Sequence, residues 1–212
     1  MMKIVLGSQS PQRKALLQSI VPAEQLLILP PESDNEPGFE DCRTVASIES
    51  QLLNIVRIKR ADVLRQLQAG TQVDSLDCVI CADTVVVVPG GDSAKQQFVL
   101  GKPPADNWQD VVREWFAKYY SGMTHEVWTG FSVATASASR EMIVKTSVTF
   151  CDVDDSWMEW YLSTEEPIGK AGGYGIQEHA AVFVNSISGS LSSVVGLPVF
   201  EVGQALRELG GL

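Results

Sequence analysis

A single acidic residue interrupts an apolar stretch near the middle of the chain. Residues 78–88 read C-V-I-C-A-D-T-V-V-V-V, a run rich in β-branched side chains that predicts a strand buried on both faces. Asp83 places a carboxylate in the middle of that strand, beside Thr84. Because an isolated ionised carboxylate is strongly disfavoured in an apolar setting, we expect a lysine, an arginine or a metal ion beside it. The alternative is a purely structural salt bridge, or hydrogen bonds from loop amides.

The first loop of the chain is a second candidate for chemistry. Residues 3–6 predict a short strand, and a polar turn then leads directly into a helix for which Ser10 is a natural N-cap and Pro11 a natural first residue. A strand, a polar turn and a helix N-terminus form an anion site, because free amides and the helix dipole point at the turn. Ser8 and Arg13 would add a hydroxyl and a guanidinium. The alternative is an ordinary capped helix with a surface arginine.

Other charged residues could complete such a site. The longest helical pattern, residues 42–69, has a basic side that includes Lys59. Lys102 stands in a Gly/Pro turn, where it could bind phosphate as a point charge. The acidic loop at residues 30–38 could supply oxygen ligands for Mg²⁺. Each of these charges could instead be solvated at the surface.

The elements that must position these residues alternate between strand and helix in the first half, with a long hairpin in the second. Beyond the elements named above, we expect a strand at 25–29 and a helix that opens at Asp106 and carries a buried aromatic stripe. Hairpin strands should follow at 124–138 and 142–150, and then a helix opened by Asp154 or Asp155. The last expected elements are a Gly-dense stretch at 165–177, a strand at 181–187 and a C-terminal helix. This pattern predicts a single α/β domain over residues 1–212, with a mixed sheet and a cleft between two lobes.

The composition excludes several classes of function. A formal net charge of −10 argues against nucleic-acid polymers as partners, although a local cluster of Lys and Arg can still attract a small anion. No stretch approaches the ~20 apolar residues of a membrane span, so we expect no membrane association. The N-terminus lacks the apolar region of a secretory signal, and the expected location is therefore cytoplasmic.

The four cysteines include a C-x-x-C, formed by Cys78 and Cys81. Inside a strand, positions three apart face opposite sides, and no second C-x-x-C follows. We therefore expect buried free thiols in a reducing compartment, and not a zinc or redox motif.

Six short segments of the chain stand in a diagnostic order. They are residues 7–13, 82–87, 101–103, 121–130, 166–177 and 194–198. Each is weak alone, but six in register are specific, and together they resemble the Maf family of nucleotide pyrophosphatases, named for septum formation. The resemblance implies a long twisted mixed β-sheet with flanking helices and a deep cleft between two lobes, similar to inosine triphosphate pyrophosphatase. It also suggests a homodimer.

The family resemblance implies an activity and a set of site residues. The activity is metal-dependent hydrolysis of a nucleoside triphosphate to the monophosphate and pyrophosphate, with Mg²⁺ or Mn²⁺ as cofactor. The family's proton acceptor matches Asp83, which is also an expected metal ligand. A second acidic ligand aligns with Asp34, whereas a one-residue insertion would bring Glu36 into that place. The expected phosphate-side and substrate-binding residues are Ser8, Ser10, Arg13, Lys59 and Lys102.

Three further matched positions set the family's base preference. Thr84 and Gln177 are what the branch that acts on dTTP and UTP carries, whereas Gln12 stands where that branch has Arg. An amide such as that of Gln177 offers one donor and one acceptor, which can pair with the imide edge of uracil or thymine. We therefore expect a pyrimidine preference, with purine or modified bases as the alternative. A different class of function, a non-enzymatic nucleotide-binding regulator of cell division on the same fold, is the other alternative.

Overall fold

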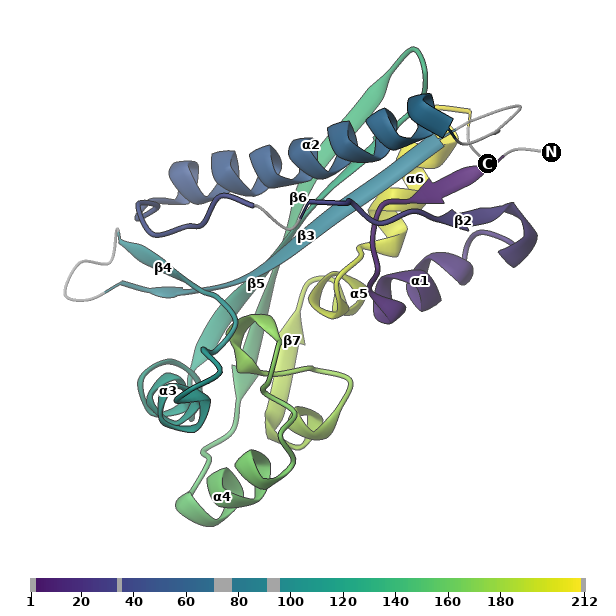
Figure 1. Ribbon diagram of the computed structural model, residues 1–212. Coiled ribbons are helices and arrows are strands. Elements are labelled where there is room, and N and C mark those ends of the chain that lie inside the picture. The colour runs from purple at the N-terminus through teal and green to yellow at the C-terminus, as the bar shows by residue number, and fades with distance from the viewer. Residues whose placement is uncertain (1–2, 34–35, 71–77, 91–95, 211–212) are drawn as a thin grey trace.

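A seven-stranded mixed sheet forms the centre of the fold, with its strands in the order β2-β1-β3-β5-β6-β7 and β4 paired to β3 (Figure 1). The computed structural model describes residues 3–33, 36–70, 78–90 and 96–210. The strands are β1 Ile4–Leu6, β2 Leu26–Ile28, β3 Cys78–Pro89, β4 Gln97–Leu100, β5 Thr124–Ala134, β6 Ser139–Phe150 and β7 Val184–Ser188. β1 is parallel to β2 and β3, and the remaining pairings are antiparallel. The predicted α/β class is confirmed.

Helices cover both faces of this sheet. They are α1 Pro11–Gln18, α2 Val45–Gly70, α3 Trp108–Trp115, α4 Asp155–Ser163, α5 Leu191–Val195 and α6 Val199–Glu208. The long helix α2 lies along one face of β3, while α1 and α6 pack on the opposite face (Figure 1). The fold thus places β3 between two helical layers, which is why its sequence is apolar at nearly every position.

The two faces of β3 are set by the period of two in a strand. Val79 and Cys81 pack under Val56 and Val63 of α2, whereas alternate residues such as Ile80 face α1 and α6. The predicted separation of the two strand cysteines is confirmed, because Cys78 lies on the Ile80 face and Cys81 on the other. Both are buried, and among the described residues neither forms a disulfide. Burial raises the pKa of Cys81 to about 12, so this thiol stays protonated and unreactive at neutral pH.

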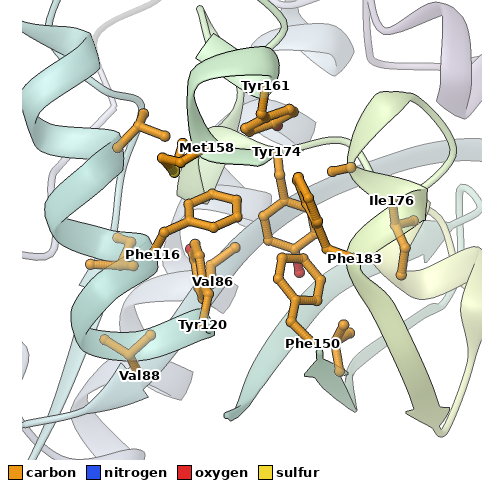
Figure 2. Packing of buried hydrophobic residues seen from close by; sticks show 14 of the residues in the cluster. Val86, Val88, Phe116, Tyr120, Phe150, Met158, Tyr161, Tyr174, Ile176 and Phe183 are labelled. Atoms are coloured by element: carbon orange, nitrogen blue, oxygen red, sulfur yellow. The ribbon is translucent and has the colours of Figure 1, made fainter. Parts of the chain in front are cut away.

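A second core fills the other half of the molecule and is rich in aromatic residues (Figure 2). Phe116, Tyr120 and Phe150 contact one another with ring centroids 5.1 to 5.9 Å apart. Phe183 joins them edge-on at 5.6 Å from Phe116. The aromatic stripe predicted after residue 106 is therefore core, and it continues past α3 as a π-helical turn, Phe116–Tyr120. This core supports the Gly-dense stretch through Tyr174.

Some predicted boundaries were wrong. The strand expected at 181–187 begins only at Val184, because Ala180 and Phe183 are buried in a preceding 3₁₀ turn that packs into the aromatic core. Helix α3 is capped by Asn107 and not by Asp106. The first hairpin strand ends at Ala134, short of the predicted residue 138. Among the described residues, no helix combines the length and the apolar character needed to cross a membrane.

Candidate active site

A cleft of about 770 Å³ opens where the end of β1, the middle of β3 and the Gly-dense stretch meet. Every predicted site residue that the structure describes lines it: Ser8, Ser10, Gln12, Arg13, Glu36, Lys59, Asp83, Thr84, Lys102 and Gln177. Asp34, the alternative metal-binding acid, lies outside the described residues. The structure therefore brings the predicted residues to one place, and their individual roles stay predictions.

Asp83 has the cationic partner that its buried strand demands. It lies on the face of β3 that α2 covers, and Lys59 of α2 donates a hydrogen bond from Nζ to Oδ1 of Asp83 at 2.6 Å. The same Nζ lies 3.1 Å from Oε1 of Glu36. The side chains of Lys59 and Asp83 are only 11% and 17% exposed, so water screens the pair weakly. The expected cation beside Asp83 is thus a lysine.

Arg13 is fixed on the other face of β3. Its guanidinium donates three hydrogen bonds: Nε to the carbonyl of Gly196 at 2.9 Å, one terminal nitrogen to Oγ1 of Thr84 at 3.2 Å, and the other to Oγ of Ser8 at 3.4 Å. All three acceptors are neutral, so no acid among the described residues pairs directly with this positive charge.

The environment of Arg13 has opposing effects on its pKa. Burial lowers the pKa of the guanidinium from its ordinary value, while the carboxylates of Asp83 and Glu36 act against that decrease. An arginine remains protonated in proteins because its ordinary pKa is so high. Arg13 therefore contributes a permanent, partly desolvated cation to the cleft, which strengthens its attraction for an anion.

The loop between β1 and α1 has the geometry predicted for an anion site. Oγ of Ser10 accepts from the backbone N–H of Arg13 at 3.3 Å, and Oγ of Ser8 accepts from the N–H of Ser10 at 3.2 Å. Gly7 allows the loop to lie against the sheet, since a Cβ there would come 2.5 Å from Sγ of Cys81. The N-cap and the close approach together hold α1 with its N-terminus at the cleft.

Two lysines also line the cleft. Lys102 is exposed in the turn that follows β4. Lys170, which sequence analysis did not single out, also lines the cleft; its Nζ donates to the carbonyl of Glu166 at 2.8 Å and lies 3.0 Å from Oε2 of Glu178. The cleft is therefore rich in cations although the chain as a whole is acidic.

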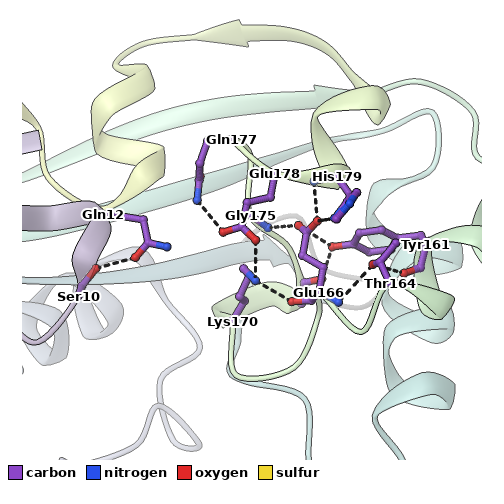
Figure 3. Close-up of polar contacts among 11 residues, drawn as sticks. Ser10, Gln12, Tyr161, Thr164, Glu166, Lys170, Gly175, Gln177, Glu178 and His179 are labelled. Carbon is purple, nitrogen blue, oxygen red and sulfur yellow. Dashed lines mark hydrogen bonds and ion pairs between the residues drawn. The ribbon is translucent and has the colours of Figure 1, made fainter. Parts of the chain in front are cut away.

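The buried carboxylate of Glu166 organises the Gly-dense stretch (Figure 3). It accepts hydrogen bonds from the backbone N–H of Gly175 at 3.0 Å and of His179 at 2.6 Å. It also accepts from the hydroxyl of Tyr161 at 3.3 Å, and Nδ1 of His179 lies 3.0 Å away. These contacts hold both ends of the segment that carries Gln177.

The hydroxyl of Thr84 is hydrogen-bonded to Thr129, a residue that sequence analysis did not assign to the site. Thr84 and Thr129 are directly opposite in the β3–β5 register, and their Oγ1 atoms are 2.9 Å apart. Thr129 then donates to the carbonyl of Ser193 at 2.7 Å. The available sequence signal for this contact was the polar side chain of Thr129 inside strand β5. Through Thr84 and Thr129, Arg13 is linked to α5.

The acidic residues of the cleft fit a hard divalent cation. Among the described residues, no group of three or more His, Cys, Asp or Glu could hold a metal ion by itself. Asp83 and Glu36 nevertheless present carboxylates to a common point, the ammonium of Lys59. Mg²⁺ typically binds through one or two carboxylates, with waters and substrate phosphates as its other ligands, so this pair is sufficient on the protein side.

Comparisons with known proteins agree on one family. A family model described as Maf-like protein matches residues 3–209. Among curated proteins, the chain is 34% identical over 207 residues to a dTTP/UTP pyrophosphatase of Pseudoalteromonas atlantica, covering 97% of this chain and 96% of the relative. It is 36% identical to the dTTP/UTP pyrophosphatases of Cupriavidus metallidurans (98% and 96% covered) and Carboxydothermus hydrogenoformans (99% and 100% covered). The similarity thus extends over nearly the full length of this chain and of each relative.

Proposed function

Since this chain belongs to the Maf family, we propose that it hydrolyses nucleoside triphosphates to the monophosphate and pyrophosphate, with dTTP and UTP preferred. The observation that carries this proposal is the cleft itself, in which Asp83, Lys59 and Arg13 meet in a chain similar to dTTP/UTP pyrophosphatases along its whole length. An enzyme, and not only a nucleotide-binding protein, is supported because acidic and cationic side chains of the kinds that the proposed chemistry uses line one cleft.

The proposed reaction is attack of water on the α-phosphorus. Asp83 orients the water and takes its proton, the new bond forms between the water oxygen and phosphorus, and the bond to the β-phosphate oxygen breaks. Pyrophosphate leaves with the electron pair of that bond. Arg13, Lys59 and Lys102 stabilise the negative charge on the phosphoryl oxygens, because pre-positioned cations in a partly dehydrated cleft cost no reorganisation during the reaction.

Asp83 and Glu36 are the described residues proposed to hold the divalent cation, Mg²⁺ or Mn²⁺, and Asp34 remains the alternative to Glu36. When bound, the cation supplies charge neutralisation for the triphosphate. Lys59 occupies the position between the two carboxylates, 2.6 and 3.1 Å from them. Its flexible side chain can turn toward a phosphate and leave both carboxylates to the metal.

The base preference is proposed to follow from Gln177, Gln12 and Thr84. Gln177 is exposed at the rim of the cleft, where its amide can meet the imide edge of uracil or thymine. The hydroxyl of Thr84 is bonded to Arg13 and Thr129, so its influence on a base would pass through those contacts. We also infer a cytoplasmic location and a homodimer. Size-exclusion chromatography with light scattering would test the homodimer, because it measures the molar mass in solution.

The function is tested by incubating the protein with a panel of nucleoside triphosphates and Mg²⁺ or Mn²⁺. Monophosphate and pyrophosphate should appear in equal amounts, fastest with UTP or dTTP. Release of orthophosphate alone would show that a different bond is cut. A faster reaction with purine triphosphates would overturn the base assignment, while binding without turnover would favour the regulatory alternative.

A further inference from the structure

The two cleft glutamines each have one end of the amide already occupied by a neighbour (Figure 3). Ser10 donates from Oγ to Oε1 of Gln12 at 3.1 Å. Gln177 donates from Nε2 to Oε1 of Glu178 at 3.1 Å. An amide can rotate to present either its oxygen or its nitrogen, and a fixed partner removes that choice. The carboxylate of Glu178 can only accept, so Gln177 keeps its nitrogen toward Glu178 and presents its carbonyl oxygen to the cleft. The hydroxyl of Ser10 can donate or accept, so it does not fix the amide of Gln12 in the same way.

This arrangement matches one kind of base edge. Uracil and thymine offer a ring N–H donor between two carbonyl groups, and that N–H complements the acceptor that Gln177 presents. Cytosine has an unprotonated ring nitrogen in place of the N–H, so the carbonyl of Gln177 would face a second acceptor. A base that sets one acceptor against another loses the hydrogen bond that uracil or thymine makes, and this loss disfavours cytosine.

Glu178 can fix the amide of Gln177 only if its own carboxylate is held in place. Lys170 does so: its Nζ lies 3.0 Å from Oε2 of Glu178 and donates to the backbone carbonyl of Glu166 at 2.8 Å. Lys170 and Glu178 are each about one-quarter to one-third exposed, at 26% and 34%. The ion pair also neutralises Glu178, which would otherwise repel a triphosphate entering the cleft.

We propose that Glu178, held by Lys170, is a specificity-determining positioning residue that fixes the amide of Gln177 with its carbonyl oxygen toward the base. The inference rests on the proposed function and adds a residue to it. Glu178 does not touch the substrate. It acts through Gln177, and its contribution is to discriminate uracil and thymine from cytosine.

The test compares kcat/KM for UTP and CTP in the wild type and in Glu178→Gln. A neutral amide at position 178 can accept from or donate to Gln177, so the orientation is lost and the UTP/CTP ratio falls by about tenfold, the equivalent of one hydrogen bond of ~1.4 kcal/mol. Glu165→Gln makes the same charge change at an exposed position of the same segment and should leave the ratio unchanged. An unchanged ratio in Glu178→Gln would overturn the inference.

A double-mutant cycle separates positioning from a general effect on the cleft. In a Gln177→Ala background there is no amide to orient, so adding Glu178→Gln should no longer change the ratio. A tenfold change that persists without Gln177 would show that Glu178 acts by another route and would also overturn the inference. A wild-type protein that hydrolyses no triphosphate would instead refute the proposed function, a result that these ratios cannot imitate.

Discussion

Lys59 and Asp83 form an ion pair across the interface between α2 and β3, with Nζ 2.6 Å from Oδ1. The pair lies at the edge of an apolar contact, because Val56 and Val63, one turn of α2 on either side of Lys59, pack against Val79 and Cys81 of the strand. Replacing a buried pair by apolar residues often costs nothing, so stability alone does not require it. The position of the Lys59–Asp83 pair in the cleft supports a role in the proposed hydrolysis.

Replacing Asp83 by Asn should abolish turnover while the protein stays folded. Asparagine keeps the shape of the side chain but cannot take a proton from water, and the loss of a general base typically lowers the rate by about 10²–10⁴-fold. Lys59 keeps Glu36 as a partner, 3.1 Å away, so the substitution does not leave the ammonium of Lys59 without an acidic neighbour. Steady-state release of pyrophosphate and the thermal midpoint would be measured together.

The matched control for that variant is Asp110→Asn on the exposed surface of α3. It removes the same charge at an exposed position that is not among the residues lining the cleft, and it should keep wild-type turnover. An Asp83→Asn protein with full activity would refute the role of Asp83 as base. A variant that loses activity only because it unfolds would show a lowered thermal midpoint.

Removing divalent metal should stop the reaction, and Glu36→Gln should weaken metal binding. A chelator is expected to reduce turnover to background, with recovery on addition of Mg²⁺ or Mn²⁺. Since Glu36 is proposed as one of two carboxylate ligands, its replacement by a neutral amide should raise the metal concentration for half-maximal activity by about tenfold or more. Activity would be titrated with Mg²⁺ at saturating UTP.

The exposed Glu40, in the same loop region, supplies a control through Glu40→Gln. Its metal titration should match that of the wild type. If Glu36→Gln also gives a wild-type titration, the acid that serves the metal lies elsewhere, and Asp34 becomes the candidate for the same experiment.

Local sequence signals were sufficient for several parts of this site. The cap by Ser10 and the need of Asp83 for a cation follow from neighbouring residues and elementary electrostatics, and both are confirmed. The identity of that cation was harder. Lys59 is 24 residues away in the chain, and the pattern of α2 places several basic residues on one side without showing which one reaches β3.

The Gly-dense stretch shows where sequence reasoning ended. Gly169, Gly172 and Gly173 have φ of 69° to 76°, a region that favours glycine, so no helical or strand period describes the path of the chain. The contacts of Glu166 and Glu178 depend on that path. The density of glycines therefore located the segment, but the sequence could not reveal that Glu178 contacts the amide of Gln177.

Gln177→Glu should shift the base preference from uracil toward guanine. A carboxylate is acceptor-only and can accept from the two adjacent N–H groups of guanine, whereas it would meet at least one carbonyl oxygen of uracil. We expect the UTP/GTP ratio of kcat/KM to fall by about tenfold or more. Gln177→Ala is the control, because it should weaken UTP without improving GTP. Improvement with GTP in both variants would show that only steric space matters.

The buried histidine of the aromatic core predicts how stability depends on pH. His125 is 1% exposed; its Nε2 lies 2.6 Å from the hydroxyl of Tyr174, and its Nδ1 is a buried nitrogen without a hydrogen-bond partner among the described residues. Burial lowers the pKa of His125 to about 3, from an ordinary value of 6.5. The folded protein therefore holds this ring in its neutral form throughout the neutral and mildly acidic range.

The sign of the effect follows from proton linkage. Between pH 6.5 and about 3, the unfolded chain binds a proton at His125 that the folded protein does not, so the free energy of unfolding decreases by roughly 1.4 kcal/mol per pH unit as the pH falls. His125→Gln cannot titrate, and its stability deficit relative to wild type should shrink by about 1.6 kcal/mol between pH 6.5 and 5, because the unfolded ring is only half protonated at pH 6.5. Urea unfolding of both proteins at these pH values measures the difference, in which the shared carboxylates cancel. A deficit that stays constant over this interval would mean that His125 accepts its proton in the folded core, through rearrangement around Tyr174.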